Sequence, residues 1–89
     1  MKQLFHITRV LSDSELTELN RILLDNDAIL LAQDGVYQLI KGLPNCESIY
    51  LLAEDADARG LSVDEIEVIR IDYPKMVELT VEHDAILNW

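Results

Sequence analysis

Residues 28–60 read AILLAQDGVYQLIKGLPNCESIYLLAEDADARG, and this stretch decides the fold. It holds two continuous apolar runs of strand length, Ala28–Ala32 and Ile49–Ala53, a pattern typical of strands that are covered on both faces. Each run leads through acidic or turn residues into a helical stretch, Val36–Leu43 in the first unit and Ala56–Arg59 in the second. Two strand–helix units in succession indicate a mainly parallel sheet.

Toward the N-terminus, the sequence predicts one more strand and one more helix. Leu4–Thr8 has the length and apolar content of a strand. In Ser12–Glu15 a serine is followed three residues later by a glutamate, which is the capping box that starts many helices. Leucines recur at helical spacing up to Leu23, and Asp25–Asp27 then ends the pattern.

Toward the C-terminus, the same alternation continues. Val68–Asp72 is predicted to be a fourth strand. Pro74 suits the first turn of a helix, with Asp72 or Tyr73 as its cap, and Met76–His83 continues that helix. The whole chain therefore predicts an α/β fold with a mainly parallel, four-stranded sheet and helices on both faces.

Length and composition place the chain among small folded domains with few basic residues. At 89 residues it is too short for a second core, so residues 1–89 are expected to form a single domain. Seventeen acidic and seven basic side chains give a net charge of −10, which opposes binding to nucleic acid or to an anionic membrane surface. Neither a spanning segment nor a signal peptide is recognisable, and the expected location is the cytoplasm.

Motifs that hold cofactors or metals are not found in the sequence. The three glycines, at positions 35, 42 and 60, form neither a dinucleotide fingerprint nor a P-loop, so no cofactor is expected. His6 and His83 lack the spacing of a metal site. His6 is interpreted as a packed strand residue rather than a proton donor beside a reactive sulfur, and His83 as a surface partner of its acidic neighbours.

Cys46 is the one candidate nucleophile, and its context favours an incidental thiol. Functional sites in α/β sheets usually form at the carboxyl ends of the strands, and the loop that holds Cys46 lies at the opposite edge. The adjacent Glu47 is expected to raise the thiol pKa. Asp34-Gly35 and Glu54-Asp55 do follow the central strands, and helix capping is favoured for them over an acidic binding site.

The last residues, Asp84–Trp89, show no helical pattern but are strongly apolar. An apolar end with a tryptophan predicts burial, either against its own domain or against a neighbouring chain. The candidate interface residues are Tyr37, Tyr73, Ile86, Leu87 and Trp89.

Several blocks together resemble the TusB/DsrH family of sulfur-relay proteins. The resemblance spans nearly the whole chain in the family's order and spacing. Its blocks are Phe5-His6, Leu30–Tyr37, Tyr50–Asp55 with Ala58–Leu61, and Ile71–Tyr73 with Val77, Leu79–His83 and Trp89. Two departures are the stretch Thr8–Leu11, where many relatives have Arg-Ser-Pro-Trp, and Ser14–Leu24, which lacks the cysteine that some relatives carry there.

The resemblance implies a DsrE-like three-layer α/β/α fold and a place in a heterohexamer with TusC-like and TusD-like subunits. Such a complex takes persulfide sulfur from a TusA-like donor, holds it on a cysteine of the TusD-type subunit, and passes it to a TusE/DsrC-like acceptor for 2-thiolation of the tRNA wobble uridine. The TusB-type chain is implied to be structural, not an enzyme.

Three other interpretations of function remain open at this point. The first is sulfur transfer of the DsrEFH type in sulfur oxidation. The second is a persulfide carrier that uses Cys46. The third is a small signalling or nucleotide-binding domain, although the glycine loop that nucleotide binding needs is missing.

Overall fold

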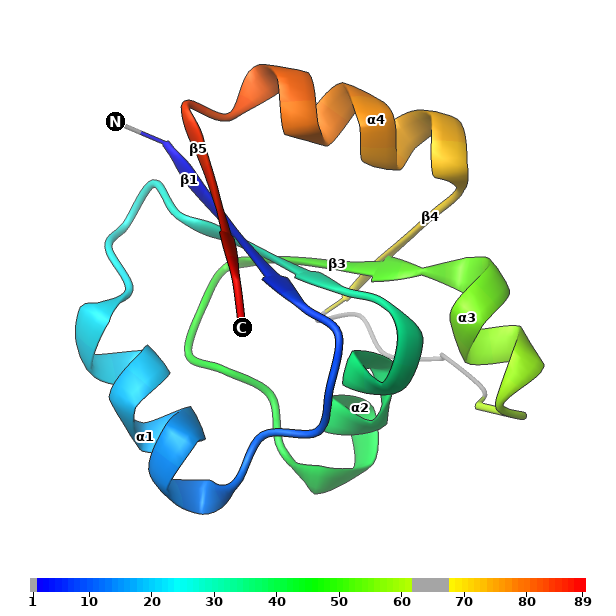
Figure 1. Cartoon of the computed structure of the whole chain (residues 1–89), viewed down its shortest axis with the longest axis horizontal. Coiled ribbons are helices and arrows are strands. Elements are labelled where there is room, and N and C mark those ends of the chain that lie inside the picture. The colour runs from blue at the N-terminus through cyan, green and yellow to red at the C-terminus, as the bar shows by residue number, and fades with distance from the viewer. Residues whose placement is uncertain (1, 62–67) are drawn as a thin grey trace.

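The computed structural model describes residues 2–61 and 68–89, which form one parallel sheet with helices on both faces (Figure 1). The strand order is β4-β3-β2-β1-β5, and every neighbouring pair is parallel. The strands are β1 (Gln3–Ile7), β2 (Ala28–Leu31), β3 (Ser48–Leu52), β4 (Ile69–Ile71) and β5 (Ala85–Asn88). The two continuous apolar runs of the sequence are thus neighbours in the sheet, and β2 is its central strand.

The helices divide unequally between the two faces. They are α1 (Asp13–Ile22), the 3-10 helix η1 (Gln33–Tyr37), α2 (Gln38–Lys41), α3 (Ala53–Ala58) and α4 (Tyr73–Glu82). Figure 1 shows α1 and α2 on one side of the sheet and α4 on the other. Leu19 of α1, Val36 of η1 and Ala56 of α3 belong to one buried cluster, so these helices cover the same face.

The core consists of two clusters that the sheet separates. The larger lies under α1, η1 and α3, and the smaller lies under α4. The larger contains Phe5, Ile7, Leu11, Leu19, Ile29, Leu31, Val36, Ile49, Leu51, Ala56 and Val68, and the smaller contains Leu4, Ala28, Leu30, Ile71 and Leu79. Alternate residues of β1 and β2 fall in different clusters, as the two-residue period of a strand requires.

The sheet has five strands, so the prediction of four is wrong. The apolar end of the chain forms β5, which pairs with β1 in the register Leu4↔Ile86 and Phe5↔Leu87. The Trp89 ring also packs edge-on against Phe5, with the centroids 6.4 Å apart. Part of the apolar surface of this end is therefore buried against the chain's own sheet.

Helix boundaries were predicted better at capped starts than elsewhere. Ser12 and Glu15 form the expected capping box, and Asp72 caps α4 by accepting a hydrogen bond from the backbone N–H of Lys75 at 3.0 Å. The helix predicted over 36–43 is instead η1 followed by the short α2. The helix predicted over 56–59 begins earlier, at Ala53, and the strand predicted over 68–72 is limited to Ile69–Ile71.

Gly35 allows η1 to pack directly on β1. A Cβ at this position would lie 2.0 Å from the carbonyl oxygen of Ile7, which is backbone and cannot rotate away. Any side chain would force the two segments apart. The close approach brings the turn after β2 onto the end of β1.

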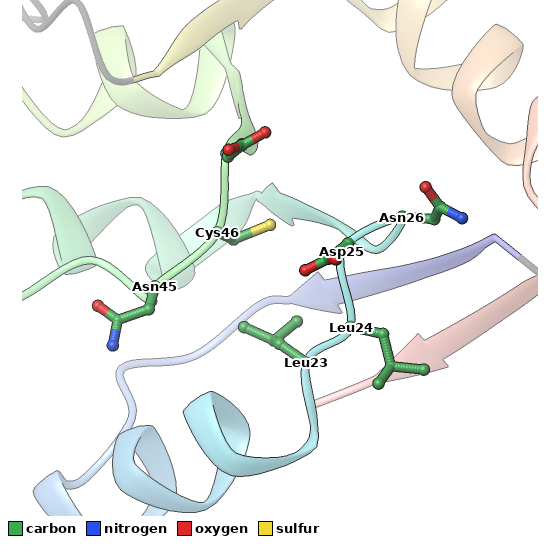
Figure 2. A pocket seen from close by; sticks show the side chains of 7 residues that line it. Leu23, Leu24, Asp25, Asn26, Asn45 and Cys46 are labelled. Atoms are coloured by element: carbon green, nitrogen blue, oxygen red, sulfur yellow. The ribbon is translucent and has the colours of Figure 1, made fainter.

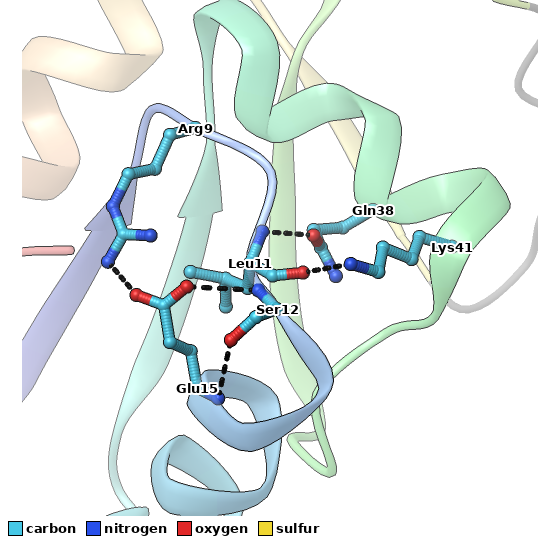
Figure 3. A network of polar contacts seen from close by, with 6 residues as sticks. All are labelled: Arg9, Leu11, Ser12, Glu15, Gln38 and Lys41. Carbon is cyan, nitrogen blue, oxygen red and sulfur yellow. Dashed lines mark hydrogen bonds and ion pairs between the residues drawn. The ribbon is translucent and has the colours of Figure 1, made fainter.

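The loop 8–11 is fixed by polar contacts with α2 (Figure 3). The backbone N–H of Leu11 donates to the buried Gln38 Oε1 at 2.8 Å, and Lys41 Nζ donates to the Leu11 carbonyl at 2.6 Å. Gln38 Nε2 in turn donates to the carbonyl of Gly42 at 2.7 Å. These bonds satisfy buried backbone groups and fix the start of α1 against α2.

Candidate functional site

Cys46 lies in the loop between α2 and β3, at the edge of the sheet where the strands begin (Figure 2). The loop from α1 to β2 lies beside it, and the two loops enclose an open hollow of about 470 Å³. The hollow is lined by Leu23, Leu24, Asp25, Asn26, Asn45, Cys46 and Glu47. Its lining is mainly polar, and none of its described lining residues has a cationic side chain that could stabilise a thiolate.

The Cys46 thiol is half-buried and directed at backbone carbonyl groups. Sγ donates to the carbonyl of Asp27 at 3.3 Å and makes a longer contact of 3.6 Å with that of Ser48. The side chain also packs against the larger core cluster. A thiol that donates to carbonyl oxygens is held in its protonated form.

The electrostatic surroundings of Cys46 also favour the protonated thiol. Burial raises the pKa of the Cys46 thiol; a backbone hydrogen bond at Ser48 offsets part of the rise, and the carboxylates of Asp27 and Glu47 add to it. At neutral pH the sulfur is therefore a protonated thiol, whereas nucleophilic attack requires the thiolate. This arrangement suits a structural cysteine better than a sulfur carrier.

The two histidines do not lie beside the thiol. His6 follows Phe5 in β1, so its side chain points to the α4 face, whereas Cys46 packs on the opposite face. His6 Nε2 is buried and has no hydrogen-bond partner among the residues that the structure describes. His83 is not held by its acidic neighbours as expected, because its Nδ1 donates to the Leu79 carbonyl at 2.7 Å.

The acidic residues after the central strands connect η1 with α3 and do not cap their own helices. Neither η1 nor α3 has a side-chain hydrogen bond at its N-cap, so the predicted local capping is wrong. Asp34 Oδ1 instead accepts from Arg59 Nε at 3.0 Å. Asp55 Oδ2 accepts from the backbone N–H of Gln33 at 2.6 Å. These carboxylates thus have structural partners.

Within residues 2–61 and 68–89, no three His, Cys, Asp or Glu side chains gather closely enough to hold a metal ion. In the same part of the chain, no helix has the length and apolar character needed to cross a bilayer.

The candidate interface residues differ in how much surface they expose. Trp89, Leu87 and Tyr37 are half-buried, and the first two pack against the larger core cluster. Ile86 and Tyr73 are among the exposed large apolar side chains.

Sequence reasoning missed two more exposed apolar residues, Val77 and Val81, which follow Tyr73 along α4. The spacing of four residues between these positions is a signal that could have found them, because it places all three on one side of a helix. Met76 and Leu79 already supply the buried side that an α/β helix needs, so the pattern does not require a second apolar side.

The fold is that of a small parallel α/β protein of known architecture. The solution NMR structure of protein Tm0979 from Thermotoga maritima matches it with a TM-score of 0.66, covering 91% of this chain and 92% of that one at 24% identity. At this identity the likeness concerns the fold alone.

Sequence comparison establishes the family. The sequence model of DsrH-like proteins matches residues 10–86. The proteins named TusB of Salmonella arizonae and Salmonella typhimurium are 40% identical to this chain over 86 residues, covering 88% of it and 90% of each relative. TusB of Salmonella paratyphi A is 42% identical over 77 residues, or 78% of this chain and 81% of the relative. The chain belongs to the TusB/DsrH family of sulfur-relay proteins, which confirms the resemblance.

Proposed function

We propose that this chain is a structural, non-catalytic subunit of a sulfur-relay complex. The observation that carries the proposal is the environment of Cys46. Its thiol is half-buried and donates a hydrogen bond to a carbonyl oxygen, and the pKa of the thiol is raised. A relay cysteine must ionise before it can attack a donor, and this environment opposes ionisation. The chain then contributes to the relay by binding to other subunits.

The partners in this proposal are TusC-like and TusD-like chains, two of each with two copies of this one. Sulfur enters from a TusA-like donor, is carried by the TusD-like cysteine and leaves to a TusE/DsrC-like acceptor, for 2-thiolation of the tRNA wobble uridine in the cytoplasm. The net charge of −10 supports a role without direct contact to nucleic acid or to a membrane. The exposed Ile86 and Tyr73 support contact with other protein chains.

Co-expression with the TusC-like and TusD-like chains of the same genome tests this proposal. Native mass spectrometry of the purified material should give one species that contains all three chains in equal numbers. A chain that elutes alone while the other two assemble without it would contradict the proposal.

An alternative function is a persulfide carrier, and one observation favours it: Cys46 lines an open hollow, so a donor could approach from that side. Incubation with a persulfide donor followed by mass spectrometry separates the two functions. Cys46→Ser serves as the matched control. The structural proposal predicts no added sulfur on Cys46 in the intact complex, and a stoichiometric adduct that Cys46→Ser abolishes would favour the carrier.

A further inference from the structure

Helix α4 has apolar residues on two separate sides. Met76 and Leu79 pack on the sheet in the smaller core cluster. Tyr73, Val77 and Val81 are 45%, 57% and 79% exposed, respectively. Residues four positions apart follow one another along the surface of a helix, so these three form a continuous row, named here the α4 stripe. A helix that only covered a sheet would carry polar residues there.

The stripe lies on the side of α4 that faces away from β3. Glu82 lines the same hollow as Tyr50 of β3, so it marks the β3 side of the helix. Lys75 lies two turns before Glu82 on that same side, and a 3.6-residue turn places Tyr73 and Val77 on the other side.

A further exposed apolar residue lies on the edge strand β5. Ile86 pairs with Leu4, a member of the cluster under α4, so its side chain points to that same sheet face. It is 42% exposed. The α4 stripe and Ile86 thus lie on one side of the molecule, whereas the exposed Ile40 of α2 lies across the sheet.

The charges around the stripe indicate what can cover it. Glu78 and Glu82 form the next row around the helix, and Asp84 follows its end. Lys75 is the only basic residue of α4, and it already pairs with Glu78 at 3.3 Å. A second copy of this chain would add another −10 to an acidic surface, which opposes self-association.

We infer that the α4 stripe with Ile86 docks on a partner subunit that offers an apolar patch bordered by lysine or arginine. The inference rests on the proposed structural role and adds the surface that performs it. Apolar contact at the stripe supplies affinity, and the acidic row selects the partner and speeds encounter with it.

The apolar contact of the α4 stripe is tested with the double variant Val77→Gln and Val81→Gln. Glutamine favours helices and both sites are exposed, so α4 stays folded, which circular dichroism checks. Affinity for the co-expressed TusC-like and TusD-like chains should fall about tenfold to a hundredfold. The matched control Ile40→Gln, at a residue 73% exposed across the sheet, should bind as the wild type does.

The acidic part is tested with Glu78→Gln and Glu82→Gln, which should slow association and make its rate less sensitive to salt. Wild-type binding by the valine variant would overturn the inference and leave the structural role intact. Absence of binding by the wild-type chain itself would overturn both. Dimerisation of the isolated chain that the valine variant abolishes would assign the stripe to a second copy and also overturn the inference.

Discussion

At the scale of single residues, Cys46 shows why the presence of a thiol does not define a sulfur site. Its sulfur contacts two carbonyl oxygens, and burial and the carboxylates of Asp27 and Glu47 raise its pKa. Sulfur-transfer cysteines need the opposite conditions, namely exposure and neighbours that stabilise negative charge. The sequence already indicated this much, since Glu47 is adjacent to the cysteine.

The reactivity of Cys46 follows from the same contacts. In the folded protein it should react with iodoacetamide more slowly than free cysteine at neutral pH, and its rate should rise with pH to a midpoint above that of a free thiol. Alkylation rates over a pH series, read by mass spectrometry, measure both quantities, and the urea-unfolded chain is the control. A fully reactive thiol in the folded chain at neutral pH would show that this description of the site is wrong.

Gly35 gives a second prediction at this scale. Gly35→Ala places a Cβ 2.0 Å from the carbonyl oxygen of Ile7, and the strand must move to admit it. The free energy of unfolding should fall by about 3 kcal/mol, the upper part of the usual range for overpacking. Gly60→Ala is the control, because its Cβ would contact none of the residues that the structure describes, and the positive φ of 68° opposes the substitution by about 1 kcal/mol. Equal losses in urea unfolding would refute the steric explanation.

At the scale of elements, the start of α1 combines a cap and an ion pair (Figure 3). Ser12 Oγ accepts from the Glu15 backbone N–H at 3.2 Å, and the Glu15 carboxylate accepts from the Ser12 backbone N–H at 3.0 Å. Arg9 adds an ion pair to the same carboxylate. One glutamate thus connects the helix to the loop that precedes it.

The pKa of Glu15 predicts a pH dependence of stability. Arg9, and after it the Ser12 backbone, lowers this pKa from 4.5 to about 2. Because the pKa is lower in the folded chain, the contribution is fully present above pH 4.5 and is lost as pH falls toward 2. Urea unfolding of the wild type and of Glu15→Gln should differ at neutral pH and converge across this window.

Glutamine can still form the capping box, so this difference isolates the charge. Arg9→Gln removes the main cause of the lowered Glu15 pKa, so it should reproduce most of the stability difference between wild type and Glu15→Gln. A constant difference between wild type and Glu15→Gln down to pH 2 would contradict the pKa assigned to this carboxylate.

The elements that the sequence predicted well have strong local signals. The apolar runs at 28–32 and 49–53 and the capping box at Ser12 depend on neighbouring residues alone. Strand β5 could not be predicted locally, because its four residues show no strand pattern and its position depends on β1, which is far away in sequence. Just before the two strands, for example, Lys2 N donates to Asp84 Oδ2 at 2.8 Å.

At the candidate site, too, the sequence predicts features that depend on adjacent residues and not those that depend on tertiary packing. The position and environment of Cys46 follow from adjacent residues and from the order of elements. The bonds of Asp34 to Arg59 and of Asp55 to Gln33 join η1 and α3, so they depend on how two helices pack. Local sequence favoured capping, and tertiary packing supplied different partners.

At the scale of the whole molecule, the two faces of the sheet are unequally covered. In the part of the chain that the structure describes, α1, η1 and α3 contribute buried residues on one face, whereas α4 covers the other and leaves its own apolar stripe exposed. A chain of this size has limited surface to bury, so contact with other subunits is a direct way to gain stability. This favours a role in assembly over a role in chemistry.

The most direct test of that role is sulfur transfer by a complex assembled with Cys46→Ser. The rate at which sulfur passes from a persulfidated TusA-like donor to a TusE-like acceptor should equal that of the wild-type complex, because Cys46 contributes no reacting atom. Transfer that drops to background while the Cys46→Ser complex remains fully assembled would contradict the account.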